Sequence, residues 1–327
     1  MKKKCFRYGE TVVANGKNST QKIGIPSALT YYIHELDWTR FFSYLGYETV
    51  VSDKSSYDTF KQGFNFAAND HCLPIKTFFG HIIELKDQVD YLFIPQLVSL
   101  EKNTFSCPHI LGAHLLIKNM QLKLPPVFST EIDVNYPKLT LLKSVVLAMK
   151  FSKNPFKVFK AVNYIRKNIQ SLFGEQSQQQ DIFSGVVDKT IGVIGRNYML
   201  NDPFLNKNLV ENIKKYGFNV MTSEAFIHSA ERETHHFNCR PVHWYSGRTM
   251  VTAAANFMKN PQIEGVIFVN FFGCGIDAFI EEIFKKELSE QKPYLNISFD
   301  EHSGEAGMMT RLEAFIDMIK RKRKALV

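Results

Sequence analysis

Short apolar runs alternate with amphipathic helical patterns along most of the chain, and this alternation restricts the fold more than any other feature. In the first half, residues 23–25, 47–51 and 90–94 are apolar runs of strand length. In the second half, residues 190–195 and 265–270 are further runs of this kind. Strands that alternate with helices usually pair in parallel, so we expect an α/β fold with two Rossmann-like or flavodoxin-like sheets.

The chain has 327 residues, which favours two domains over a single core. We predict an N-terminal α/β domain over residues 1–135 and a C-terminal α/β domain over 185–327. Residues 136–184 are expected to form a basic helical connector that ends in a polar linker. Helical periodicity also predicts one helix over 28–45 and another over 203–216.

Composition excludes several classes of protein. Hydrophobic residues make up 45% of the chain and charged residues 22%, which are values of globular rather than disordered proteins. No run of 18 apolar residues is present, so we expect no membrane span. The N-terminal residues 1–7 are basic and are not followed by the apolar segment of a secretory signal, which predicts a cytoplasmic protein.

Positive charge is concentrated in one segment of a chain whose net charge is +8. No acidic residue lies between Asp133 and Glu175. The segment is either a solvated helix face or a docking face for an acidic partner or a phosphate-bearing ligand. No nucleic-acid module is recognisable, so we do not expect nucleic-acid binding. Its basic residues are Lys138, Lys143, Lys150, Lys153, Lys157, Lys160, Arg166 and Lys167.

Three of the five cysteines are placed to begin helices. Cys72 lies two residues before Pro74 and Cys107 lies directly before Pro108, and proline is favoured in the first turn of a helix. Cys274 lies between a predicted strand and a predicted helix. We therefore expect all three in strand-to-helix turns, at the edge of a parallel sheet where ligands bind.

A helix N-terminus has free N–H donors and a partial positive charge, which are expected to lower a thiol pKa. The same donors stabilise an iron–sulfur cluster, and Gly273 and Gly275 would let the backbone approach it closely. Three thiolates from both halves would hold a cluster between the domains and leave the fourth iron open. Cys239, in a predicted loop, is a candidate fourth ligand, whereas Cys5 is expected to be incidental.

Two other interpretations of the cysteines remain. Free cysteine is among the most buried residue types, so each can be a small core side chain. A zinc site is the second alternative, because His71, His109 and His243 lie near cysteines in the sequence.

Polar residues in the helix after Cys72, and others that follow the predicted strand over 294–299 at the ligand-binding edge, are candidates for acid–base chemistry. Each has a structural alternative. Lys76 is equally expected to be an exposed surface lysine. Asp300 and Glu301 are expected to cap the following helix and to pair with Arg311. The acid–base candidates are Lys76, His81, Glu301 and His302.

Several short segments together resemble the 2-hydroxyacyl-CoA dehydratase D-component family (2-hydroxyglutaryl-CoA dehydratase-like) and a domain related to CoA-substrate activases. The resemblance covers roughly residues 22–135 and 188–320. The segments that carry it are residues 23–53, Cys72-Leu73-Pro74-Ile75-Lys76, Gly80-His81, Cys107-Pro108, Phe272-Gly273-Cys274-Gly275-Ile276-Asp277, Asp300-Glu301-His302-Ser303 and Thr310-Arg311-Leu312-Glu313-Ala314-Phe315.

The resemblance implies an oxygen-sensitive protein with a [4Fe-4S] cluster held by three cysteines between Rossmann-like domains. Matching residue by residue makes Cys72, Cys107 and Cys274 the ligands. An ATP-hydrolysing activase would supply low-potential electrons, and a 2-hydroxyacyl-CoA would be reduced and dehydrated. The partners implied are that activase, a second dehydratase-like subunit or a homodimer, and an acyl-CoA. The alternative is a non-catalytic electron relay or maturation partner of an activase.

Overall fold

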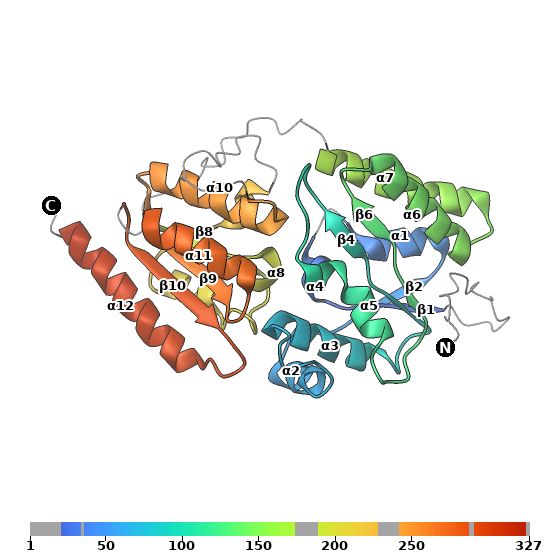
Figure 1. Ribbon diagram of the computed structural model, residues 1–327, viewed down its shortest axis with the longest axis horizontal. Helices are drawn as coiled ribbons and strands as arrows, with labels where there is room; N and C mark the ends of the chain where they lie inside the picture. The colour runs from blue at the N-terminus through green and yellow to red at the C-terminus, as the bar shows by residue number, and fades with distance from the viewer. Residues whose placement is uncertain (1–20, 34–35, 174–188, 228–241, 288–290, 325–327) are drawn as a thin grey trace, which may run out of the picture.

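The computed structural model describes residues 21–33, 36–173, 189–227, 242–287 and 291–324. Two α/β lobes lie side by side, the first containing β1–β6 and α1–α7 and the second β7–β10 and α8–α12 (Figure 1). Each lobe is built on a four-stranded parallel sheet. The predicted α/β class with parallel sheets is confirmed. None of the described helices has the length and apolar character needed to span a bilayer.

The sheet of the first lobe has the strand order β2-β1-β3-β5. Ile23 of β1 lies opposite Thr49 of β2 on one side and Tyr91 of β3 on the other. Two further strands, β4 and β6, form a separate parallel pair that the sequence did not predict, because both are short. The strands are β1 (Lys22–Ile25), β2 (Glu48–Val51), β3 (Tyr91–Phe93), β4 (Gln96–Ser99), β5 (Val127–Phe128) and β6 (Glu131–Asp133).

The helix predicted over 28–45 is wrong. A 3-10 turn, η1, is followed by the separate helix α1, which begins after Asp37. Leu29 has a left-handed backbone (φ 51°), and the Asp37 side chain accepts from the Arg40 amide as the cap of α1. The first-lobe helices are η1 (Leu29–Tyr32), α1 (Trp38–Leu45), α2 (Tyr57–Phe64), α3 (Leu73–Leu85), α4 (Pro108–Leu111), α5 (Ala113–Lys118), α6 (Pro137–Phe151) and α7 (Pro155–Phe173).

Helices α6 and α7 form a hairpin that packs on the first lobe. Phe151 of α6 and Ile165 of α7 belong to the same buried cluster as Phe42 of α1 and Phe93 of β3. The turn of the hairpin lies between the end of α6 at Phe151 and the start of α7 at Pro155.

The sheet of the second lobe has the order β10-β9-β7-β8. The helix predicted over 203–216 is wrong, because Lys207 and Asn208 both have left-handed backbones and α9 starts only after them. The elements are β7 (Thr190–Ile194), α8 (Asn197–Leu200), α9 (Leu209–Lys215), β8 (Asn219–Thr222), η2 (Ser223–Phe226), α10 (Tyr245–Lys259), β9 (Ile263–Phe271), α11 (Gly275–Glu287), β10 (Tyr294–Phe299) and α12 (Glu305–Lys324).

The lobes share a buried core as well as polar contacts. Ile75 and Phe78 of α3 belong to one apolar cluster with Met199 of α8. A parallel backbone bridge joins Phe105 to Trp244. Because apolar burial and hydrogen bonds both cross the junction, residues from both lobes can form one site there.

Candidate active site at the junction of the lobes

The three predicted cysteines begin helices in the structure. Cys72 is the N-cap residue of α3, and Cys107 is the N-cap residue of α4. Cys274 directly precedes α11, and its carbonyl accepts from the Ala278 amide. The expectation of a strand-to-helix connection is wrong for Cys72, which lies between α2 and α3. Cys107 lies in the connection from β4 to α4, and Cys274 lies between β9 and α11.

Thiols from the two lobes are close enough to influence one another. The pKa of the Cys72 thiol is raised to about 12, mainly by burial and to a smaller extent by the charges of Cys107 and Cys274. Burial also raises the pKa of Cys274, with a smaller contribution from Cys107. All three thiols are free and partly buried. The three cysteines therefore share one electrostatic environment.

The expected lowering of the thiol pKa by helix N-termini is wrong for Cys72 and Cys274. The amide of Ile75 does lower the pKa of Cys72, and the amide of Asp277 that of Cys274. In both cases desolvation outweighs the amide. A metal-free chain would therefore keep these two thiols protonated at neutral pH, and binding of a metal would have to displace their protons.

Arg196, which sequence reasoning did not assign to the site, contacts one of the cysteines. It follows β7 at the carboxyl edge of the second sheet, and its Nη2 donates to Cys274 Sγ at 3.4 Å and to Asp277 Oδ1 at 2.7 Å. Its Nη1 donates to Ser246 Oγ at 2.8 Å. Burial disfavours the charged guanidinium, but attraction to Asp277, Tyr198 and Cys274, together with the hydrogen bond to Asp277, outweighs burial and raises the Arg196 pKa.

The strand order of the second sheet explains why Arg196 lies at the site. In an open parallel sheet, ligands bind at the carboxyl edge where the order reverses, which here is between β7 and β9. Arg196 follows β7 and Cys274 follows β9, so both lie at this point. An arginine placed directly after a central strand was thus the signal that could have found it.

Space lies in front of the turn that carries Cys274. A Cβ built on Gly273 or on Gly275 would meet no atom within 4 Å. Gly273 has a left-handed backbone (φ 77°) that favours glycine. Free thiols, a neighbouring cation and open space fit an anionic iron–sulfur cluster, in which each thiolate binds a different iron. Among the described residues, no group of three or more His, Cys, Asp or Glu side chains is arranged to hold a single metal ion.

Two of the histidines considered for zinc lie beside Cys72. The Nδ1 of His109 is 4.0 Å from Cys72 Sγ, and the rings of His71 and His109 are 5.2 Å apart. Burial and the neighbouring His109 lower the pKa of His71. The His243 carbonyl accepts from the Phe105 amide. These contacts place polar rings next to one thiol without forming a zinc site among the described residues.

Lys76 joins the two lobes. Its side chain is 2% exposed, so the surface-lysine alternative is wrong. The Nζ donates to Glu301 Oε1 of the second lobe at 3.0 Å and to the Asn69 carbonyl at 3.2 Å, and lies 5.1 Å from the centre of the Phe64 ring. A buried cation held by one carboxylate is a structural link between the lobes.

His81 is fully buried between two serines. Its Nδ1 lies 2.9 Å from Ser52 Oγ and its Nε2 lies 2.9 Å from Ser55 Oγ. Ser55 Oγ donates to Asp202 Oδ2 of the second lobe at 2.5 Å. Since Ser55 gives its proton to Asp202, it accepts from His81 Nε2–H, while Nδ1 also lies 3.6 Å from Glu84 Oε2. Both ring nitrogens are thus engaged in a chain that links the lobes.

The remaining polar candidates form a turn before α12. The Asp300 carboxylate accepts from the His302 amide at 2.9 Å and from Ser303 Oγ at 2.7 Å. The expected ion pair with Arg311 is wrong, because Arg311 donates to the Asn296 carbonyl at 2.6 Å. His302 is exposed. Cys5 and Cys239 lie outside the described residues.

Two known family models match parts of the chain. The family model described as CoA enzyme activase uncharacterised domain (DUF2229) matches residues 22–226, which is more than half of the chain. The chain belongs to this family. A second model, 2-hydroxyglutaryl-CoA dehydratase, D-component, matches residues 214–319. No curated protein matches the chain.

The two matches divide the cysteines between them. Cys72 and Cys107 lie in the part that matches the CoA enzyme activase domain, and Cys274 lies in the part that matches the dehydratase D-component. The relation to both groups that the sequence motifs indicated is confirmed. Arg196 falls in the activase-domain match and its partner Asp277 in the dehydratase match.

Proposed function

We propose that this CoA enzyme activase-domain protein holds a [4Fe-4S] cluster on Cys72, Cys107 and Cys274 at the junction of its lobes. The observation that carries the proposal is that three free, partly buried thiols begin three separate helices in two lobes, and that Cys72 and Cys274 pack against the same core cluster. Helix N-termini and low-dielectric surroundings suit an anionic cluster whose sulfurs accept N–H hydrogen bonds. When bound, such a cluster supplies one-electron chemistry at low potential.

The chain's own residues would support that group. Arg196 donates to the Cys274 sulfur and is held by Asp277, so a fixed cation would offset the negative charge of the site. The open space at Gly273 and Gly275 would admit the inorganic atoms without a clash. Cys239 remains a candidate for the fourth iron.

The proposed reaction is reduction or dehydration of an activated substrate, with low-potential electrons supplied by an ATP-dependent activase. The dehydratase D-component match over the Cys274 lobe supports an acyl-CoA substrate. A second dehydratase-like subunit or a homodimer would complete the enzyme. The cytoplasmic location expected from the sequence belongs to this proposal, because a cluster of this kind requires a reducing compartment.

A non-catalytic electron relay or maturation partner of an activase is the second candidate. It is favoured by the extent of the activase-domain match, which covers more of the chain than the dehydratase match. In a relay the fourth iron would be closed by a protein ligand, whereas an enzyme needs it open to substrate.

The test is spectroscopy on protein purified without oxygen. A brown protein with broad absorption near 400 nm and an EPR signal on reduction is expected for the cluster. If that EPR signal shifts when an acyl-CoA is added, the enzyme is supported. An EPR signal that is indifferent to acyl-CoA supports the relay, and a colourless protein free of iron and sulfide contradicts both.

A further inference from the structure

The helical hairpin of α6 and α7 carries an apolar outer face far from the cysteines in sequence. The inner face of α6 is buried through Leu147 and Phe151. Its outer face is apolar as well, although a solvated helix normally has a polar outer face. The apolar side chains exposed on α6, spaced by three and four residues, are Leu139, Leu142, Val146 and Met149.

Two phenylalanines continue this face onto α7. Phe156 is 83% exposed and Phe159 is 71% exposed, which are high values for phenylalanine side chains. Contiguous apolar surface of this kind, on a protein with a large internal core, marks an interaction site.

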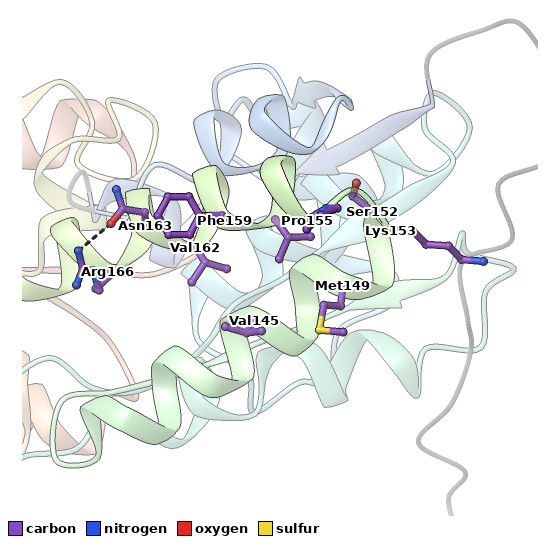
Figure 2. A pocket seen from close by; sticks show the side chains of 10 residues that line it. Val145, Met149, Ser152, Lys153, Pro155, Phe159, Val162, Asn163 and Arg166 are labelled. Atoms are coloured by element: carbon purple, nitrogen blue, oxygen red, sulfur yellow. Dashed lines mark hydrogen bonds between the residues drawn. The ribbon is translucent and has the colours of Figure 1, made fainter.

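The face is hollowed into a groove between the two helices. The groove has a volume of about 690 Å³, and Val145 and Met149 of α6 and Phe159 and Val162 of α7 line it (Figure 2). A concave apolar groove between two helices accepts the side chains of a partner helix.

The charged groups that line the groove are both positive. Lys153 and Arg166 line its two ends (Figure 2). Neither side chain is in an ion pair with a carboxylate among the residues that the structure describes; Arg166 Nη2 donates to Asn163 Oδ1 at 2.9 Å. No acidic residue lies between Asp133 and Glu175 to compensate them.

We propose that the α6–α7 groove binds an acidic amphipathic helix of a partner protein. Leucine-like side chains of that helix fill the groove, and its carboxylates contact Lys153 and Arg166. A second copy of this chain is disfavoured as the occupant, because two such positive faces would repel each other. The basic residues 320–324 near the C-terminus are disfavoured for the same reason.

The test uses the full chain and a labelled synthetic peptide of about 18 residues, roughly five helical turns, with leucine on one face and glutamate elsewhere. Fluorescence anisotropy should show saturable binding that weakens as salt is added. A peptide with lysine in place of each glutamate should not bind. Phe159→Ala, and separately the double variant Lys153→Gln/Arg166→Gln, should each weaken binding about tenfold or more. These side chains are at the surface, so the variants should fold.

Matched controls are exposed residues elsewhere on the first lobe. Leu115→Ala on α5 and the double variant Lys54→Gln/Lys61→Gln should leave the affinity unchanged. Absence of peptide binding, or equal loss in the controls, overturns the proposal. It is also overturned if Phe159→Ala abolishes sedimentation with vesicles of phosphatidylserine and phosphatidylcholine while the acidic peptide fails to bind, because the face would then be a membrane contact.

Discussion

Arg196 donates a hydrogen bond of 3.4 Å to the sulfur of Cys274, and the same nitrogen is held by Asp277 Oδ1 at 2.7 Å. The arginine follows β7 and the cysteine follows the neighbouring strand β9, so the contact forms where the order of the second sheet reverses. The thiol is thereby hydrogen-bonded to a buried ion pair. Loss of either partner of that pair should therefore change the hydrogen bonding and the charge around the sulfur.

Arg196→Met should lower the free energy of unfolding by about 3–5 kcal/mol, since it leaves the Asp277 carboxylate buried and unpaired. Arg196 and Asp277 are 3% and 2% exposed. Urea denaturation at pH 7 under reducing conditions measures the effect. In the double variant Arg196→Met/Asp277→Leu no charge is left unpaired, so much of the loss should be recovered. A double variant as unstable as the sum of its single variants would contradict this account of the pair.

Glu301→Gln should destabilise the chain by about 1–3 kcal/mol, because it leaves the buried Lys76 cation without its carboxylate. The matched control is Glu211→Gln, which removes an exposed ion pair with Lys214 and should stay within about 0.5 kcal/mol of wild type. Thermal unfolding of both variants side by side makes the comparison. Equal effects would show that Lys76 and Glu301 do not link the lobes energetically.

The Asp202 carboxylate predicts a dependence of stability on pH. Burial raises its pKa, and hydrogen bonds from Ser55 and from the Leu205 and Phe204 amides offset only part of the rise. A raised folded-state pKa means that the folded chain holds the proton more tightly, so this contribution to stability is present at low pH. It is lost as pH rises through the folded-state pKa.

Asp202→Asn removes this titration. The stability of wild type relative to Asp202→Asn should therefore fall as pH rises above about 4, the ordinary pKa of an aspartate, because the buried carboxyl then has to ionise. Urea denaturation at several pH values measures the difference. A difference that is constant with pH, or that grows in favour of wild type as pH rises, would contradict the sign of the shift.

Gly275→Ala should lower the amount of bound iron without much change in the stability of the fold. A Cβ at this position meets open space and Gly275 lies in the first turn of α11, so stability should change by less than about 1 kcal/mol. If the cluster occupies that space, the variant should bind less iron. Gly307→Ala in α12, where a Cβ also meets nothing within 4 Å, is the control and should keep its iron. Equal iron in the two variants would show that the space beside Gly275 is not used.

Much of the fold could be predicted because buried parallel strands are nearly continuous apolar runs. Residues 190–194 of β7 are buried throughout, and the predicted strand over 190–195 is confirmed apart from its last residue. The two helices predicted wrongly share a cause. At Leu29, and at Lys207 and Asn208, the backbone takes left-handed conformations that helical periodicity does not reveal. Side-chain caps such as Asp37 then begin shorter helices.

Only those features of the candidate site could be predicted that depend on residues close together in the sequence. Cys72 and Cys107 were placed at helix starts because the prolines follow within two residues. The burial of Lys76 depends on Glu301, which is 225 residues away, and no local pattern reports such a contact. The raised thiol pKa likewise arises from burial of the sulfur in the folded chain, which the sequence around a helix start does not reveal.

The central claim is tested most directly by iron and acid-labile sulfide per chain in protein kept free of oxygen. Wild type and Cys5→Ser should each contain about four iron and four sulfide, the content of one [4Fe-4S] cluster. Cys72→Ser, Cys107→Ser and Cys274→Ser should each lose most of both. A wild-type chain without iron and sulfide, or a Cys274→Ser chain that keeps as much as Cys5→Ser, would contradict the claim.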